Sequence, residues 1–164
     1  MYKYLILVFI ASFGHLSFAE SETTLPISAQ IFSGYSPLSG FMGSGRLNLD
    51  FKLSNRLTIG PSLDLAQSID IEYAKTSLGL TTTFEVAKFK SGSLAIRQSL
   101  YSSYVNESFG RSQNYSFLSG STGLSALMFE TKGIKWGPTI DYFYSIDGKY
   151  NANNGLFLGL TFSF

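Results

Sequence analysis

The chain has 164 residues, enough for one domain, with a formal net charge of +1 at pH 7 and no cysteine. The balanced charge argues against nucleic acid as a partner, and the lack of cysteine excludes disulfides as a source of stability. Charged residues make up only 14% and hydrophobic residues 45%, whereas soluble domains carry about 25% charged residues. This composition fits either an unusually apolar soluble domain or a membrane protein built from strands.

Residues 1–19 have the three parts of a secretory signal peptide. Lys3 lies in a short basic start, an apolar run extends from Leu5 to Phe13, and Ser17 and Ala19 form a small-x-small ending. The run is short for a membrane anchor, which needs about 20 residues. We therefore expect cleavage before Glu20. The mature chain, residues 20–164, would then hold eleven basic and eleven acidic residues.

The rest of the chain has a hydrophobic period of two. Residues 46–53 place four apolar side chains on one face and four polar or charged side chains on the other, which predicts a strand because a helix would scatter them. The same analysis predicts eight strands, at roughly 25–35, 44–53, 56–66, 72–86, 93–105, 115–130, 134–145 and 155–164.

The connections between these strands alternate in length. Short turns follow the second, fourth and sixth strands, and longer polar loops such as 106–114 and 147–154 tend to follow the others. This asymmetry is typical of an outer-membrane barrel whose short turns lie in the periplasm. The sequence therefore predicts that residues 20–164 form an all-β, eight-stranded, antiparallel up-and-down transmembrane β-barrel. The alternative is an ordinary β-sandwich.

One segment of the sequence is repeated. Residues 59–65 resemble residues 136–142, with Gly-Pro followed three residues later by Asp64 or Asp141. Proline within a strand removes a ladder hydrogen bond, so Pro61 and Pro138 predict two places where that bond is absent or a bulge is tolerated. A duplicated half-barrel and convergent strand chemistry explain the repeat equally well.

The end of the chain alternates strictly, with Leu156, Leu158, Leu160, Phe162 and Phe164 on one face. It resembles the last strand of bacterial outer-membrane barrels, which ends on an aromatic residue read by the barrel-insertion machinery. Gly159, Phe162 and Phe164 match this assembly signal, whereas Phe157 stands where a polar residue is usual.

Over about residues 25–164 the chain resembles the small OmpA/OmpX-type barrels, through its strand count, its loop asymmetry and its last strand. The resemblance implies the fold, a bacterial outer-membrane location among outer-membrane lipid, and insertion by that machinery. It implies no activity.

Aromatic residues support a membrane placement, because Tyr and Trp favour membrane interfaces. We expect two girdles. The outer one would contain Tyr35, Tyr101, Tyr104, Tyr115, Tyr142 and Tyr144, and the inner one Phe84, Phe129, Trp136, Phe162 and Phe164.

Nine charged residues are predicted to face the lumen by alternation: Arg46, Asp50, Lys52, Asp64, Lys75, Glu85, Arg97, Lys135 and Asp141. An eight-stranded barrel is just wide enough for side chains to fill it, and buried charges must be paired. These residues therefore predict a charged and polar structural plug in which Arg97 bridges Asp64, Asp141 or both. The alternative is a narrow ion path gated by the same pairs.

The residue types argue against an enzyme. The single histidine, His15, lies in the predicted signal peptide, and there is no cysteine, so the mature chain lacks a histidine base, a cysteine nucleophile and the common soft metal ligands. A mechanism based on carboxylates alone stays open, but no paired-acid motif indicates one. We predict no catalytic, metal or cofactor-binding residues. The expected function is a structural or surface-interaction barrel whose outer loops contact a ligand of unknown identity. The alternatives are a narrow channel or transporter for small or apolar solutes and a soluble lipid-binding barrel.

Overall fold

A computed structural model describes residues 26–109, 111–147 and 154–164, with the backbone alone for 107–109 and 111–113. The predicted signal peptide lies outside the described residues. The strands are β1 (Ile27–Ser36), β2 (Gly40–Leu49), β3 (Phe51–Lys52), β4 (Leu57–Ser68), β5 (Tyr73–Phe89), β6 (Gly92–Phe109), β7 (Arg111–Leu127), β8 (Phe129–Thr131), β9 (Ile134–Ser145) and β10 (Gly155–Ser163). In this part of the chain, no helix is long and apolar enough to cross a membrane.

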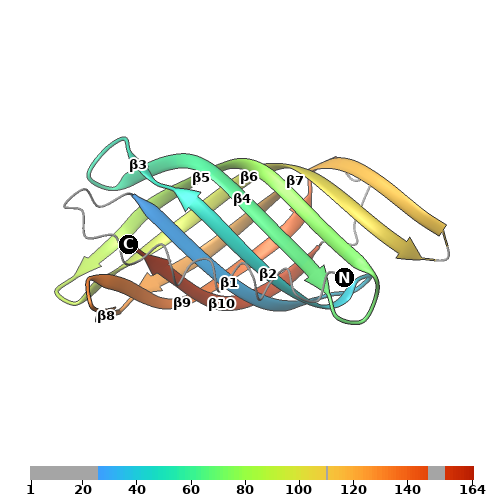
Figure 1. Cartoon of the computed structure of the whole chain (residues 1–164). Helices are drawn as coiled ribbons and strands as arrows, with labels where there is room; N and C mark the ends of the chain where they lie inside the picture. Colours follow the sequence, from blue (N-terminus) through green and yellow to red (C-terminus); the bar gives the residue numbers. More distant parts are fainter. Residues whose placement is uncertain (1–25, 110, 148–153) are drawn as a thin grey trace.

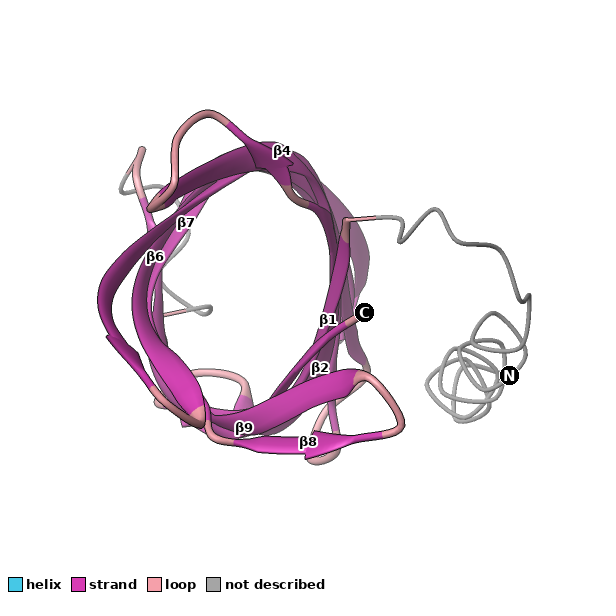
Figure 2. Cartoon of the chain, turned by 90° about the vertical axis from the view of Figure 1, so that its left-hand side faces the viewer, coloured by secondary structure: helices cyan, strands magenta, loops and turns pink. Residues whose placement is uncertain are grey.

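The strands close into one antiparallel ring. β10 pairs with both β9 and β1, which joins the two ends of the sheet. β2 and β3 follow one another along β4, and β7 and β8 follow one another along β9, so the ten segments form eight barrel strands. Figure 2 looks along the axis of this ring, and Figure 1 shows it from the side. The predicted fold class is confirmed.

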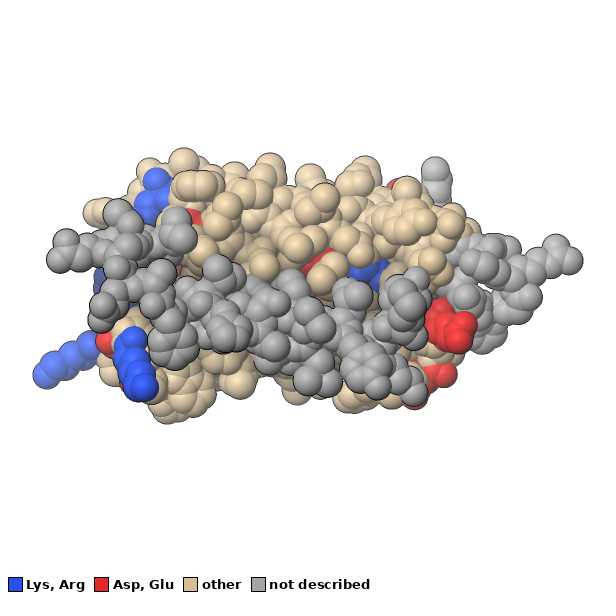
Figure 3. Space-filling view, in the orientation of Figure 1, with Lys and Arg blue, Asp and Glu red and all other residues tan. Residues whose placement is uncertain are grey.

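Strict alternation decides which side chains enter the barrel. In β4, Ser62, Asp64, Ala66 and Ser68 are buried, while the residues between them are half-buried or exposed. The outward positions of other strands carry exposed Leu78, Leu100, Leu118 and Leu158. Together these form an apolar belt, seen in Figure 3 as a largely uncharged band between the two charged ends. Soluble proteins rarely expose an apolar surface of this extent.

The two ends of the barrel differ. Short turns at 53–56, 90–91 and 132–133 lie at the end where β1 begins and β10 finishes, which we call the turn end. The last of these turns places Lys132 and Gly133 at positive φ, the backbone conformation that tight hairpins need. The opposite end, called the loop end, holds the turn 37–39, the connection 69–72 after β4 and the described residues 146–147 after β9.

The prediction of a loop over 106–114 is wrong. β6 and β7 stay paired up to Phe109 opposite Arg111, so this connection is a long hairpin that projects beyond the other strands at the loop end (Figure 1). Polar residues and glycine suggested a loop. A hairpin that projects beyond the apolar belt needs no apolar face, so its strand structure leaves no hydrophobic pattern in the sequence.

The two Gly-Pro segments lie at gaps in the strand ladder. β4 loses its pairing to β2 and β3 at Gly60 and Pro61, between Ser62 and Ile59. β9 loses its pairing to β7 and β8 at Gly137 and Pro138. Both prolines stay in register with the strand on their other side. The strand ladder is therefore interrupted at both sites, as the repeated prolines predicted.

Candidate functional site

Five of the nine predicted charges meet at mid-height in the lumen. Arg46 comes from β2, Asp64 from β4, Lys75 from β5, Arg97 from β6 and Asp141 from β9, and all five are buried. We call these five residues the central charge cluster. They come from strands on opposite walls of the barrel, so their contacts cross the interior.

Arg46 is the centre of this cluster. Its side chain has no exposed surface, and its Nη1 donates to Asp141 Oδ2 at 2.8 Å and to Gln30 Oε1 at 3.3 Å. Its Nη2 donates to Ser121 Oγ at 3.0 Å, and its Nε lies 3.8 Å from Asp64 Oδ1. One guanidinium thus links four other strands, because its planar fork presents five donors.

The two aspartates of the repeated segments have different cations. Asp64 accepts a hydrogen bond from Ser44 at 2.9 Å and lies 3.1 Å from Lys75 Nζ. Asp141 is shared by Arg46 and by Arg97, whose Nη2 lies 2.7 Å from Asp141 Oδ1. Among the described residues, Arg97 pairs with Asp141 and not with Asp64. The group that joins both aspartates is Arg46.

Hydroxyl groups extend the polar layer around the wall. Ser103 bonds Ser77 at 2.8 Å and Ser119 at 2.6 Å, and Thr81 bonds Ser99 at 2.8 Å. All of these side chains are buried. Because each hydroxyl both donates and accepts, these small inward residues satisfy one another's hydrogen-bonding groups where the lumen has no room for larger side chains.

Small residues also leave space for the charged ones. Gly123 faces Asp141 across the β7–β9 ladder, and a Cβ on Gly123 would lie 1.9 Å from Asp141 Oδ1. On the outer face, a Cβ on Gly120 would lie 2.8 Å from the ring of Tyr144. The Ser-Gly-Ser-Thr-Gly segment of β7, which has no apolar face in the sequence, is therefore the wall against which larger neighbours pack.

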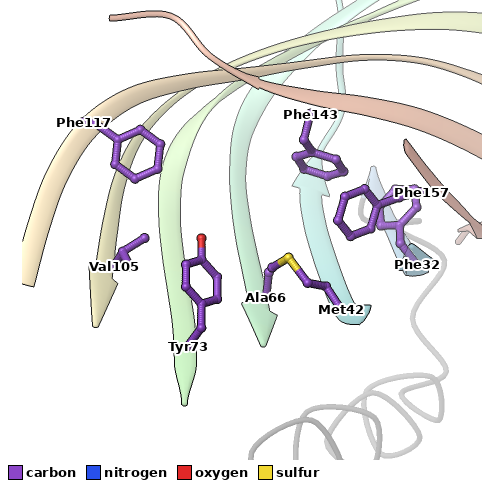
Figure 4. Packing of buried hydrophobic residues seen from close by; sticks show 8 residues of the cluster. All are labelled: Phe32, Met42, Ala66, Tyr73, Val105, Phe117, Phe143 and Phe157. Carbon is purple, nitrogen blue, oxygen red and sulfur yellow. The ribbon is translucent and has the colours of Figure 1, made fainter. Parts of the chain in front are cut away.

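An apolar layer fills the lumen between the central charge cluster and the loop end. Phe143 lies two residues beyond Asp141, and Phe32 two residues beyond Gln30. The buried apolar layer comprises Phe32, Met42, Ala66, Tyr73, Val105, Phe117, Phe143 and Phe157 (Figure 4). The lumen is therefore not filled by charged and polar residues alone, as the sequence had suggested. Aromatic residues occupy inward positions that an inventory of charges overlooks.

Cations bind the two layers together. The Arg46 guanidinium lies 5.2 Å from the ring centre of Phe32 and 5.1 Å from that of Phe143. The Lys75 ammonium lies 4.7 Å from the ring centre of Phe143. Contacts of this kind are attractive and gain strength when water is excluded. Tyr101, predicted in the outer girdle, is instead buried in the lumen, where its ring lies 5.5 Å from the same guanidinium.

The lumen stays open on the turn end. A cavity of about 600 Å³ extends from this end to Arg97. The predicted lumen residues Asp50 and Glu85 are half-buried in its wall, and Lys52 lines its exposed rim. Lys135 is exposed at the same end, in register with Glu130. These residues lie near strand ends, beyond the packed part of the interior, so they do not join the central charge cluster.

The predicted assembly residues lie in the strand that closes the ring. Gly159 is in register with Phe32 on one side and Thr139 on the other. Phe162 and Phe164 are half-buried, and the Phe164 amide donates to the Ile27 carbonyl at 3.1 Å. In the described part of the chain, no group of three or more His, Asp or Glu residues is placed to hold a metal ion.

No family model and no curated protein matches the sequence. Solved structures do resemble the chain. Neisserial surface protein A has a TM-score of 0.60 at 12% identity, over 84% of this chain and 93% of that one. The N-terminal β-barrel domain of Pseudomonas aeruginosa OprF gives 0.55 at 13%, over 86% and 98%. The outer membrane enzyme PagL gives 0.50 at 15%, over 83% and 97%. At such identities the likeness concerns the fold, and the chain has the fold of the small eight-stranded outer-membrane β-barrels.

Proposed function

We propose that this chain is a bacterial outer-membrane barrel that acts as a scaffold for its loop end and does not conduct solutes. The observation that carries the proposal is the fully buried Arg46, which joins Asp64 and Asp141 from opposite walls. The apolar layer beyond it supports the same conclusion, because ions do not enter a dry aromatic layer without a large desolvation cost.

The loop end is the surface that such a scaffold presents. β6 is the longest strand, with 18 residues, and β7 has 17 residues, as β5 does. The β6–β7 hairpin projects furthest. The short turns at the other end would lie in the periplasm, as in barrels of this type. We propose that the projecting hairpin contacts a partner outside the cell. Export would use residues 1–19, and insertion would use Gly159, Phe162 and Phe164.

A narrow channel is the second candidate, because the lumen is already open from the turn end as far as Arg97. Planar-bilayer recordings separate the two functions. We expect the refolded protein to give no unitary currents. We expect Phe143→Ala with Phe157→Ala to remain silent as well, since the charge pairs still close the centre. Reproducible unitary currents from the unmodified protein would overturn the scaffold proposal.

Location is tested on the same protein in cells. An outer-membrane fraction should contain a band whose gel migration changes on heating, because a closed barrel resists unfolding by detergent. Its amino-terminal sequence should begin at Glu20 or within a few residues of it. Recovery of the protein in the soluble periplasmic fraction would support the soluble lipid-binding barrel instead.

A further inference from the structure

We propose that the cavity at the turn end is a binding site for a phosphate group, which Arg97 holds at the cavity floor. This site is separate from the scaffold role. A silent barrel and a conducting barrel could each contain it, so the conductance experiment and the binding experiment below fail independently.

The first observation is the charge of the cavity lining. Lys52, Arg56, Lys88 and Arg97 line it, against the acidic side chains Asp50 and Glu85. The side chains of the cavity thus carry a net charge of about two positive units. The cavity is a concave space with low-dielectric walls, and such a shape concentrates the field of its charges on an entering anion.

The second observation is an unused donor at the floor of the cavity. Arg97 is 2% exposed, and its Nη2 bonds Asp141 and Thr139. Its Nε has no hydrogen-bond partner among the described residues but is fully enclosed, so a ligand in the cavity does not reach it. Its Nη1 also makes no hydrogen bond to a described residue and is not enclosed. Arg97 is the member of the central charge cluster that lines the cavity, so Nη1 is the donor that a ligand there can use. The arrangement is suited to a ligand that brings an acceptor oxygen.

The third observation is the charge around the cavity mouth. The central charge cluster has three cations and two carboxylates, and Asp50 in the cavity wall supplies a third carboxylate that interacts with Arg97, so the surplus of positive charge lies nearer the rim. Outside the cavity at the same end of the barrel, Lys90, Lys132 and Lys135 are exposed cations and Glu130 is an exposed carboxylate, which leaves a surplus of two positive charges. Figure 3 shows Lys and Arg gathered mainly at that end, and acidic residues at both ends. An anion approaching the turn end is therefore attracted before it reaches Arg97.

Phosphate is the anion that fits these features. A phosphate monoester is a dianion near neutral pH, which balances the net charge of the cavity, and its oxygens accept from guanidinium and ammonium groups together. Leu57, Leu127 and Phe164 give the cavity an apolar side, which has room for the ester portion. The source is either free phosphate or a lipid headgroup, and the two share this chemistry.

The test uses the refolded full barrel in a phosphate-free detergent at low salt. Inorganic phosphate and monomeric dihexanoyl phosphatidic acid are titrated separately, with calorimetry and phosphorus NMR as readouts. We expect saturable binding of at least one probe. Tighter binding of the ester identifies a lipid source, and equal binding identifies free phosphate. Absence of saturable binding for both probes overturns the proposal.

Variants locate the site. Arg97→Lys keeps a cation beside Asp141 but removes the Nη1 donor, and we expect about tenfold weaker phosphate binding. If that variant does not fold, the exposed pair Lys52→Gln with Lys88→Gln tests the same cavity and should weaken binding several-fold. The matched control, Lys90→Gln with Lys135→Gln, removes two charges from the same end outside the lining and should change affinity less than twofold. An equal loss in the control would mean non-specific attraction and would overturn the site.

Discussion

Arg46 is the side chain on which the buried polar contacts of the lumen converge. It pairs with Asp141, reaches Asp64 and lies against the rings of Phe32 and Phe143. Removing one partner of a buried ion pair leaves the other charge without compensation, which is more costly than replacing the whole pair with apolar groups. The interior should therefore be more sensitive to this residue than to any charge at the rim.

Arg46→Leu should lower the free energy of unfolding by about 3–5 kcal/mol, because Asp141 Oδ2, Gln30 Oε1 and Ser121 Oγ lose their donor, at about 1–3 kcal/mol for each buried acceptor left unsatisfied. Lys75 and Arg97 still pair with the two aspartates. Urea unfolding of the refolded barrel in detergent micelles measures this loss. Arg46→Lys should lose less, since it keeps the charge but not the fork. The control is Arg56→Leu at the exposed rim, with an expected change within about 0.5 kcal/mol. Equal urea midpoints for Arg46→Leu and the control would contradict the bridging role.

Alternation in the sequence predicted that Asp64 and Asp141 point inward, and both are buried. It could not predict which cation each aspartate would meet. That choice depends on how far neighbouring strands are shifted along the barrel, which fixes the height of each side chain. Alternation predicted that both Arg97 and Arg46 face the lumen, but only the closed barrel shows that Arg46 lies between the two aspartates.

At the scale of elements, β7 illustrates how small residues position larger ones. Its inward Gly123 makes room for the Asp141 carboxylate, and its outward Gly120 makes room for the Tyr144 ring. A strand of this kind has little packing surface of its own. Its glycines leave the space that the Asp141 and Tyr144 side chains of β9 occupy, so the small residues of β7 are explained by the large residues of β9.

Gly123→Ala should destabilise the barrel by about 1–3 kcal/mol, because the added methyl group would collide with the Asp141 carboxylate and the Ile140 carbonyl. The urea midpoint of the refolded variant gives the size of the effect. Ser116→Ala, an exposed position on the same strand, is the control for a general change in β7. A Gly123→Ala barrel as stable as this control would show that Asp141 can move freely.

The sequence predicted the existence of all eight strands but not the limits of every one. Periodicity identifies strands only where one face meets the lumen and the other an apolar surrounding. The β6–β7 hairpin beyond Tyr104 leaves that zone, so its residues read as a loop although they pair. The start of β2 at Gly40 was missed for a related reason: glycine at 40, 43 and 45 weakens the pattern.

Considered as a whole, the molecule has a lumen that changes character along its axis. An open cavity lies at the turn end, the central charge cluster follows, and the apolar layer completes the filling toward the loop end. The sequence predicted a plug, but it described the plug by its charges alone. The apolar layer becomes apparent only when Phe32, Phe117, Phe143 and Phe157 are placed together on the inner face of the barrel.

We predict that Phe164 takes part in assembly, because it lies where the ring closes. The residue sits at the end of β10, where its amide bonds the start of β1, and most of the β1–β10 register lies further along the strand. Deletion of Phe164 should therefore lower the amount inserted in cells, while refolding into detergent stays close to normal. Heat-shifted band intensity in outer membranes measures insertion. Deletion of Lys132, which lies in a turn and outside any closing strand, is the comparison, and undiminished insertion without Phe164 would count against an assembly signal.

The two Gly-Pro gaps have a mechanical meaning for a closed ring. One separates the second barrel strand from the third, and the other separates the sixth from the seventh, so they lie four strands apart on facing sides. A closed barrel in which two opposite strand pairs are weakened deforms by flattening its cross-section into an oval, and not by separating along one strand pair. Near the turn end, we expect the cross-section of this barrel to change shape while every strand keeps both neighbours. Amide exchange should then be faster beside these two gaps than elsewhere within the barrel strands.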